Sequence, residues 1–216
     1  MRALKITLWM RSGGNPAYDE DSAPSAFNFH LMNPGRIFTM AGEQYRYLEN
    51  MGGGNHLIIR NDTIRNSSWN AQEGVLTSWY GQLDPAVQAM VQPVANSFTT
   101  GEVAEASVTF TGGDRWLPTN LGGAVAADQT QVVAGGTVRA FALSLADVTR
   151  LSSGSGLAFP NHAQRASVAL GWWWLRTSAP SPNAWRVLAD GQLVGGTPVT
   201  FNHFAGGVRP ALILHQ

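Results

Sequence analysis

The sequence contains no cysteine and a single lysine, Lys5, among its 216 residues. The absence of cysteine excludes a disulfide scaffold, a thiolate zinc site and a thiol nucleophile. Charged residues make up only 13% of the chain, and 14 basic side chains balance 14 acidic ones. We therefore expect no nucleic-acid partner, because a phosphate backbone is held by clustered positive charge.

Long apolar runs are also missing. No stretch approaches the ~20 apolar residues that span a bilayer, so we expect no membrane insertion. The apolar residues of segment 1–10 alternate through Leu4, Ile6 and Leu8. This pattern predicts a strand, and the run is too short for the apolar part of a signal peptide.

Glycine and tryptophan are the abundant residues. The chain has 24 glycines and 8 tryptophans, and 44% of its residues are apolar. This composition predicts one loop-rich domain held by a few large anchors, and the length is ample for a core. We place that domain at 36–216, preceded by a segment 1–35 that could serve docking or oligomerisation.

Local patterns predict an α+β domain with two early helices and a late, twisted antiparallel sheet. Apolar spacing and the Asp84-Pro85 start signal predict helices over Trp69–Tyr80 and Pro85–Val94, with a shorter one over Leu145–Leu151 capped by Ser144. The Gly101–Val138 stretch predicts hairpins or long loops. The expected strands are Ile37–Tyr47, His56–Arg60, Trp185–Ala189, Gln192–Val194, Thr197–Phe201 and Val208–Leu214, with turns at 49–55, Asp190-Gly191 and Gly195-Gly196 and a loop over Asn202–Gly207. Pro210 predicts an edge position or an irregular start for the last strand.

The sequence shows no motif for catalysis, metal binding or a cofactor. Its five histidines are scattered, and Asp19-Glu20-Asp21 lacks the pattern of a calcium loop. Ser153-Gly154-Ser155-Gly156 is not a nucleophile elbow, and Gly52-Gly53-Gly54 precedes a strand instead of opening a phosphate-binding helix. A distant pair of carboxylates stays open. These observations favour binding over catalysis.

Aromatic side chains give the most informative pattern. Trp172, Trp173 and Trp174 cannot share one face of a strand, because alternate side chains point in opposite directions. We expect Trp173 and Trp174 in the core. In contrast, Trp185, Arg186, Phe201 and Phe204 lie among Ser, Asn, Pro and Gly, which is typical of a recognition surface. The alternative is that Trp185 and Phe201 are inward-facing strand residues.

Two C-terminal motifs carry a resemblance to a known family. Trp173-Trp174-Leu175-Arg176-Thr177 and Gly207-Val208-Arg209-Pro210-Ala211-Leu212 resemble the Trp-Trp-Leu-Arg-Ser and Gly-Val-Arg-Pro-Ala-Leu signatures of a bacterial and phage domain family. Weaker matches extend the resemblance over about 37–214. Members look like C-type-lectin-fold domains related in architecture to formylglycine-generating enzymes, and several are variable proteins of diversity-generating retroelements. Thr177-Ser178 replaces the usual Ser-Pro, and the first 35 residues have no counterpart.

The resemblance implies a non-enzymatic protein that binds a protein or glycan target through a variable region at about 177–206. It favours a virion or bacterial cell surface as the location and leaves a homo-oligomer open. The implied ligand-binding residues are Ser181, Asn183, Trp185, Arg186, Leu188, Asp190, Gln192, Phe201, Asn202, His203 and Phe204, with Pro182 and Val194 also variable. The implied structural frame is Trp173, Trp174, Leu175, Arg176, Ala184, Val187, Gly191, Val199, Val208, Arg209, Pro210 and Leu212. Arg176 and Arg209 are expected to stack on tryptophan or pair with a carboxylate.

Two other functions stay open. One is a carbohydrate-binding or adhesion module of the same fold without diversification, in which tryptophan faces stack on sugars. The other is an enzyme related to the formylglycine-generating or iron-dependent relatives, although the first of these chemistries needs thiolates that this chain lacks. A calcium-dependent lectin is disfavoured, since Gln92-Pro93-Val94 has no acid and no Trp-Asn-Asp motif occurs.

Overall fold

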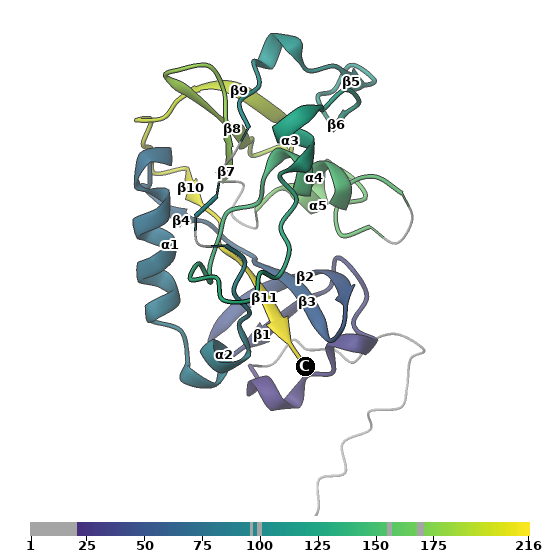
Figure 1. The fold of residues 1–216 in the computed structure, drawn as a ribbon, viewed down its shortest axis with the longest axis vertical. Coiled ribbons are helices and arrows are strands. Elements are labelled where there is room, and N and C mark those ends of the chain that lie inside the picture. The colour runs from purple at the N-terminus through teal and green to yellow at the C-terminus, as the bar shows by residue number, and fades with distance from the viewer. Residues whose placement is uncertain (1–20, 96, 99–100, 155–156, 168–170) are drawn as a thin grey trace, which may run out of the picture.

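A computed structural model describes residues 21–95, 97–98, 101–154, 157–167 and 171–216 (Figure 1). The predicted strand at Leu4–Leu8 and most of segment 1–35 lie outside these residues. The helices are α1 (Gln72–Gly81), α2 (Pro85–Met90), α3 (Gly123–Ala127), α4 (Leu145–Leu151) and α5 (His162–Arg165), with 3-10 turns η1 (Pro24–Ala26), η2 (Phe29–Leu31), η3 (Trp69–Ala71) and η4 (Glu105–Ser107). The strands are β1 (Ile37–Met40), β2 (Glu43–Gly52), β3 (Asn55–Arg60), β4 (Ile64–Arg65), β5 (Phe110–Thr111), β6 (Leu117–Pro118), β7 (Trp172–Ser178), β8 (Asn183–Val187), β9 (Leu193–Pro198), β10 (Gly206–Val208) and β11 (Ala211–His215).

The architecture is mixed α+β, as predicted, with few helices and mainly antiparallel sheets. One sheet has the order β1-β2-β3-β11, and a second has the order β4-β10-β7-β8-β9. Figure 1 shows the first sheet in the lower half of the molecule, the second in the upper half, and α1 along one side of both. The late sheet is not wholly antiparallel, because β10 pairs with β7 in parallel. The last strand, β11, joins the early sheet by pairing with β3.

Local start signals placed the helices well. The Asp84 carboxylate accepts a hydrogen bond from the amide of Ala86, so α2 begins at Pro85 as predicted. Ser144 and Asp147 form a capping box at the start of α4, in which each side chain accepts from the other residue's amide. The two early helices and the shorter third one are present as α1, α2 and α4, although α2 ends at Met90 instead of Val94. The helices α3 and α5 are additional short elements that the sequence did not predict.

Several predicted turns and strand ends need correction. Strand β2 continues to Gly52, so the predicted turn at 49–55 is much shorter. Gly195-Gly196 lies inside β9 and is not a turn, and β9 ends at Pro198 instead of continuing to Phe201. The predicted final strand is interrupted after Val208 and resumes at Ala211 in the other sheet. Most of segment 101–138 is loop, with only β5, β6 and α3 as regular elements besides the short turn η4.

The core consists of two apolar clusters, and β7 contributes to both of them. Trp172 and Trp174 belong to the cluster beneath α1 and α2, whereas Trp173 and Leu175 belong to the cluster beneath α4. This division follows from the alternation of side chains along a strand. It confirms that the three tryptophans do not share one face.

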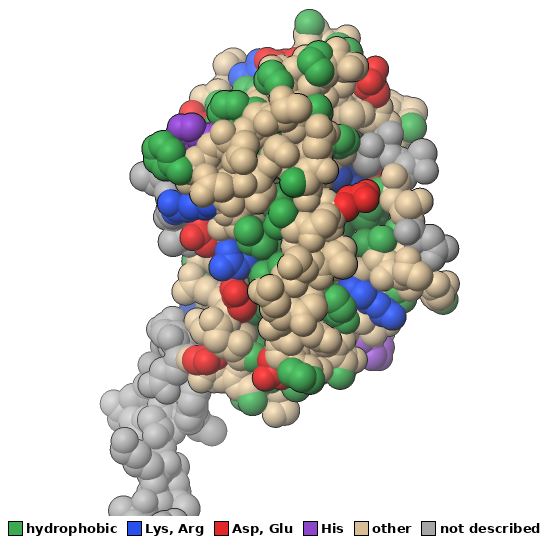
Figure 2. Space-filling view, turned by 90° about the vertical axis from the view of Figure 1, so that its left-hand side faces the viewer, with side chains coloured by type: hydrophobic (Ala, Val, Ile, Leu, Met, Phe, Trp, Pro, Cys, Tyr) green, Lys and Arg blue, Asp and Glu red, His purple; other side chains and the backbone are tan. Residues whose placement is uncertain are grey.

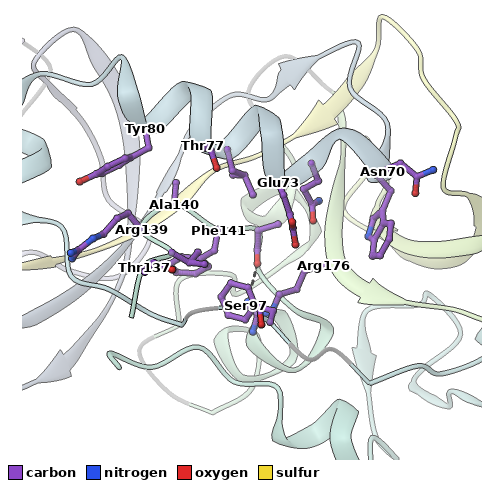
Figure 3. Close-up of a pocket in the computed structure, with 16 residues that line it drawn as sticks. Asn70, Glu73, Thr77, Tyr80, Ser97, Thr137, Arg139, Ala140, Phe141 and Arg176 are labelled. Atoms are coloured by element: carbon purple, nitrogen blue, oxygen red, sulfur yellow. Dashed lines mark hydrogen bonds between the residues drawn. The ribbon is translucent and has the colours of Figure 1, made fainter. Parts of the chain in front are cut away.

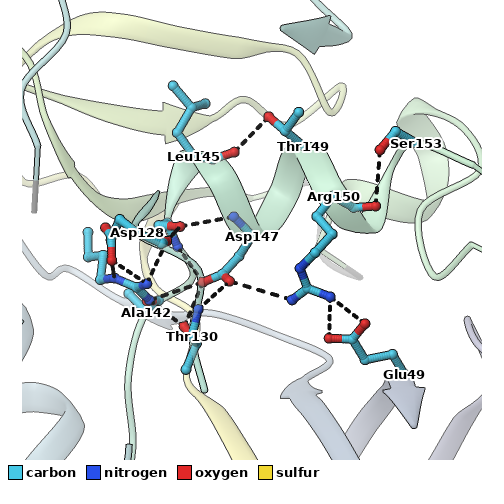
Figure 4. Close-up of polar contacts among 11 residues, drawn as sticks. Glu49, Asp128, Thr130, Ala142, Leu145, Asp147, Thr149, Arg150 and Ser153 are labelled. Carbon is cyan, nitrogen blue, oxygen red and sulfur yellow. Dashed lines mark hydrogen bonds and ion pairs between the residues drawn. The ribbon is translucent and has the colours of Figure 1, made fainter. Parts of the chain in front are cut away.

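A buried polar network fixes β7 to the loop region beside it (Figure 4). The Arg176 guanidinium lies 2.7 Å from the carboxylate of Asp128 and 3.1 Å from that of Asp147. Asp147 also accepts hydrogen bonds from Thr130, and Arg150 joins the network by pairing with both Asp147 and Glu49. Arg176 therefore has the carboxylate partners expected of a structural arginine.

Candidate ligand-binding surface

Strand β7 is a rigid base for the C-terminal surface. Trp173, Trp174 and Leu175 are fully buried. The indole of Trp174 donates a hydrogen bond to the carbonyl of Ser67, and that of Trp173 donates to the carbonyl of Arg165. Trp172 meets Trp174 edge to face, with ring centroids 5.1 Å apart. These contacts hold Trp172 where the loop after β9 can pack on it.

The loop 199–205 brings three aromatic rings together on Trp172. The Phe201 ring lies 5.4 Å from Trp172 and is nearly parallel to His203, whose ring lies 4.1 Å from Phe204. Phe204 keeps 68% of its surface exposed and Phe201 keeps 36%. Soluble proteins rarely leave contiguous large apolar side chains in water unless they contact a partner. We call Trp172, Arg186, Phe201, His203 and Phe204 the aromatic patch.

Arg186 connects the sheet to this loop. Its guanidinium lies 4.9 Å from the Trp172 ring centroid and 5.2 Å from that of Phe201. The side chain is half-buried, and burial lowers the pKa of its guanidinium. Its Nε has no hydrogen-bond partner among the described residues. Arg186 therefore combines cation–π contacts with an unused donor beside the exposed rings.

Backbone contacts set the course of the loop. The Val199 amide donates to the carbonyl of Pro182, and the Val199 carbonyl accepts from the amide of Asn70 in η3. At its other end, Gly206 lies so close to Trp172 that a Cβ atom there would come within 2.3 Å of the indole. Only glycine allows β10 to approach β7 this closely. Both ends of the loop are thus fixed, while Asn202, His203 and Phe204 between them are exposed.

The prediction that Trp185 lies on the recognition surface is wrong. Trp185 is fully buried, and its indole donates a 2.9 Å hydrogen bond to the carbonyl of Val103. Trp185 and Arg186 are adjacent on β8, so their side chains leave opposite faces of the sheet. Arg186 reaches the aromatic patch, and Trp185 enters the second core cluster. The inward-facing alternative holds for Trp185 but not for Phe201.

The other predicted ligand-binding residues do not join the patch. Ser181 is exposed before β8, and the half-buried Asn183 donates from its side chain to the carbonyl of Pro180. Leu188, Asp190 and Gln192 form the hairpin turn, where the Asp190 carboxylate accepts from the amide of Gln192. Among the described residues, no side-chain hydrogen bond or ring contact links any of these five to the exposed rings.

Gly191 anchors that turn on α5. The two segments approach so closely that a Cβ atom at position 191 would lie 2.2 Å from the carbonyl oxygen of His162. The Arg165 guanidinium also donates to the carbonyl of Gly191. Gly191 has a φ of 88°, which glycine adopts without strain. The turn is therefore part of the frame, although exposed side chains project from it.

The residues assigned to the frame are buried. Arg209 is fully buried, lies 5.2 Å from the Trp173 ring centroid, and donates to the carbonyls of Arg60 and Arg165. Burial, reinforced by the nearby charge of Arg46, lowers the pKa of Arg209 to about 9. The buried frame positions are Trp173, Trp174, Leu175, Arg176, Ala184, Val187, Gly191, Val208, Arg209, Pro210 and Leu212, and Val199 is half-buried.

Charge is mixed around this surface. Figure 2 shows acidic and basic side chains interspersed on the face turned to the viewer, with apolar side chains between them. Within the described part of the chain, no group of three or more His, Cys, Asp or Glu side chains has the arrangement of a metal site. No helix of that part combines the length and the apolar content needed to cross a membrane.

The sequence did not predict that Trp172 belongs to the aromatic patch. The three consecutive tryptophans indicated two faces, but only the return of loop 199–205 over β7 shows which indole lies directly beneath the exposed rings. Comparison of the chain with protein-family models, curated proteins and solved structures finds no match.

Proposed function

We propose that this chain is a ligand-binding protein with a C-type lectin-like fold, and that it is the variable protein of a diversity-generating retroelement. The observation that carries the proposal is the aromatic patch, in which exposed Phe201, His203 and Phe204 stand on a buried tryptophan framework. Its target is a protein or a glycan. The mixed α+β architecture is compatible with this fold.

The contrast between frame and surface supports the proposal. The apolar frame residues on β7 and β8 are buried in two core clusters. The loop side chains at 202–204 are exposed and belong to neither cluster. Substitutions in such a loop change the contact surface without removing core contacts. We remove Trp185 from the predicted variable positions, because it is a core residue.

A display library tests whether the scaffold tolerates diversity. We would randomise 202–204 in one library and the buried positions 173–175 in a matched control library of equal size. Most members of the first library should fold and be displayed, and most members of the second should not. Selection of the first library on purified proteins should then yield target-specific variants. A collapse of folding in the first library would show that the loop is structural.

Two further measurements separate this proposal from a fixed carbohydrate-binding module. A near-copy of the gene's 3′ end beside a reverse-transcriptase gene, differing only at adenines, is expected for a diversified protein. A glycan array probed with the native chain and with a Phe201→Ser/Phe204→Ser variant shows whether any sugar binding depends on the patch. Patch-dependent glycan binding without any such gene copy would favour the fixed module.

A further inference from the structure

A second concave site lies between α1 and segment 137–142. Its volume is about 470 Å³, within the range of small-molecule pockets. Figure 3 shows Glu73, Thr77 and Tyr80 of α1 facing this space, as their spacing of four and three residues on a helix allows. No residue of the aromatic patch lines it. The pocket is therefore a separate site.

Part of the pocket lining is apolar. The buried Leu76, Ala140 and Phe141 and the half-buried Phe98 all line it. The Phe98 ring also covers the guanidinium of Arg176 at 4.2 Å. A ligand that fills this space must present an apolar body to these side chains.

Two charges of opposite sign line the pocket without neutralising each other. Glu73 is exposed on α1 and has no ion-pair partner among the described residues. Arg139, on the facing segment, donates to the carbonyl of Val91 but pairs with no carboxylate of the described residues. The third charge, Arg176, is already paired with Asp128 and Asp147. The available charges thus sum to zero, with one of each sign.

Gln72 supplies an independent indication of a ligand. Its side chain lines the pocket and is only 5% exposed, and its Nε2 is buried without a hydrogen-bond partner among the described residues. A buried amide donor with no acceptor is unfavourable, and native structures rarely contain one without a reason. Rotation of the Gln72 side chain about its terminal bonds would bring this donor to a ligand oxygen next to Glu73.

We propose that this pocket binds a zwitterionic peptide of two or three residues. Its ammonium group faces Glu73, a peptide carbonyl accepts from Gln72, and its carboxylate faces Arg139. Figure 3 places Arg139 near Tyr80, and the helical rise from Glu73 to Tyr80 is roughly 10 Å. Extended peptide covers about 3.3–3.6 Å per residue, so three residues span this length and two suffice when the protein side chains reach inward.

Isothermal titration of the full chain with the tripeptide Ala-Leu-Ala tests the charge assignment. The same peptide with an acetylated amine, or with an amidated carboxylate, removes one ligand charge at a time. Each cap should weaken binding about two- to fivefold, since it deletes one charged contact at the surface. Affinity that is insensitive to both caps, or no binding of the free peptide at millimolar concentration, would overturn the proposal.

Matched variants assign each end of the ligand. Glu73→Gln should weaken binding of the free peptide and leave binding of the acetylated peptide unchanged. Arg139→Gln should likewise weaken binding of the free peptide and leave binding of the amidated peptide unchanged. Arg65→Gln, an exposed arginine outside the pocket, is the control and should change neither. Circular dichroism confirms that each variant is folded. An acetylation effect that persists in Glu73→Gln would contradict the assigned orientation.

This site and the proposed function can fail separately. Phe201→Ser/Phe204→Ser should leave peptide binding unchanged, because neither residue lines the pocket. Tighter binding of maltose than of the peptide, lost in Gln72→Leu, would assign the pocket to neutral sugars and overturn the zwitterion proposal. Neither result would alter the outcome of the display experiment on the patch.

Discussion

Gly195 on β9 lies directly against the indole of Trp185 on β8. A Cβ atom at position 195 would stand 2.6 Å from the ring carbon Cε2, a distance that real Cβ atoms do not adopt. Because Gly195 has no side chain, the Trp185 indole of the neighbouring strand can occupy the space beside it. This pair shows why the hairpin β8–β9 can direct Trp185 inward while Arg186 meets the surface.

Gly195→Ala should destabilise the protein by about 1–3 kcal/mol, because the new methyl group overlaps a ring that is buried on all sides. Gly74→Ala is the opposite control. Gly74 lies inside α1 with open space around its Cα, so alanine should stabilise the helix by about 0.5–1 kcal/mol. Urea denaturation of both variants checks the two signs. Equal effects would contradict the close packing at Trp185.

Trp185→Ala and Phe204→Ala should differ strongly in their effect on stability. Trp185 is fully buried, and its loss should cost about 3–5 kcal/mol. Phe204 is 68% exposed, and its loss should change the free energy of unfolding by at most about 0.5 kcal/mol. Thermal unfolding measures both. A large loss for Phe204→Ala would assign the exposed rings a structural role.

Arg176→Met should cost about 3–5 kcal/mol, because it leaves the buried carboxylate of Asp128 without a cation and that of Asp147 with only Arg150. The pair of Arg60 and Glu43 provides the comparison. Both of its side chains are partly exposed, and Arg60→Gln should cost at most about 1 kcal/mol. Chemical denaturation distinguishes these values, and similar losses would argue against a special role for the Arg176 network.

Stability should decrease as the pH falls from about 6.5 to 4. His56 is fully buried and contacts the Tyr47 hydroxyl. Burial, with smaller contributions from the positive charges of His30 and His215, lowers the pKa of His56 to about 4. In the unfolded chain a histidine has a pKa of ~6.5, so between these values only the unfolded state binds the proton. The loss should reach about 3 kcal/mol.

His56→Gln is the control for this pH dependence. Glutamine cannot take up the proton, so the slope of stability between pH 6.5 and 4 should become shallower in the variant. An NMR titration of the wild-type His56 ring should place its midpoint near pH 4. A midpoint near 6.5 would contradict the expected burial effect.

The parts of the fold that could be predicted depend on local chemistry. Asp84-Pro85 and Ser144 determine helix starts within a few residues, and both predictions are confirmed. In contrast, Gly195-Gly196 has the local appearance of a turn but lies in a strand, because the strand partner requires a site without a side chain there. The need for glycine at this position comes from Trp185 on the neighbouring strand. The turn propensity of the local sequence contains no information about that contact.

The candidate sites show the same limit. The exposed Phe201 and Phe204 could be recognised from their polar surroundings, and His203 only through the family resemblance. The inward direction of Trp185 depends on the register of β8. The pocket was not predicted at all. Its lining comes from η3 and α1, from Ser97 and Phe98, from segment 137–142 and from Arg176, which only the tertiary structure brings together.

The end of the chain closes both sheets: β10 pairs with β4 and β7, and β11 pairs with β3. A polypeptide that stopped just after Phe204 would lack a strand from each sheet and the buried Arg209 between them. Such a truncated product should stay unfolded and be cleared by cellular proteases. Premature stop codons within the loop would therefore leave no folded protein. Every folded copy that exposes Phe201 and Phe204 must also contain β10 and β11.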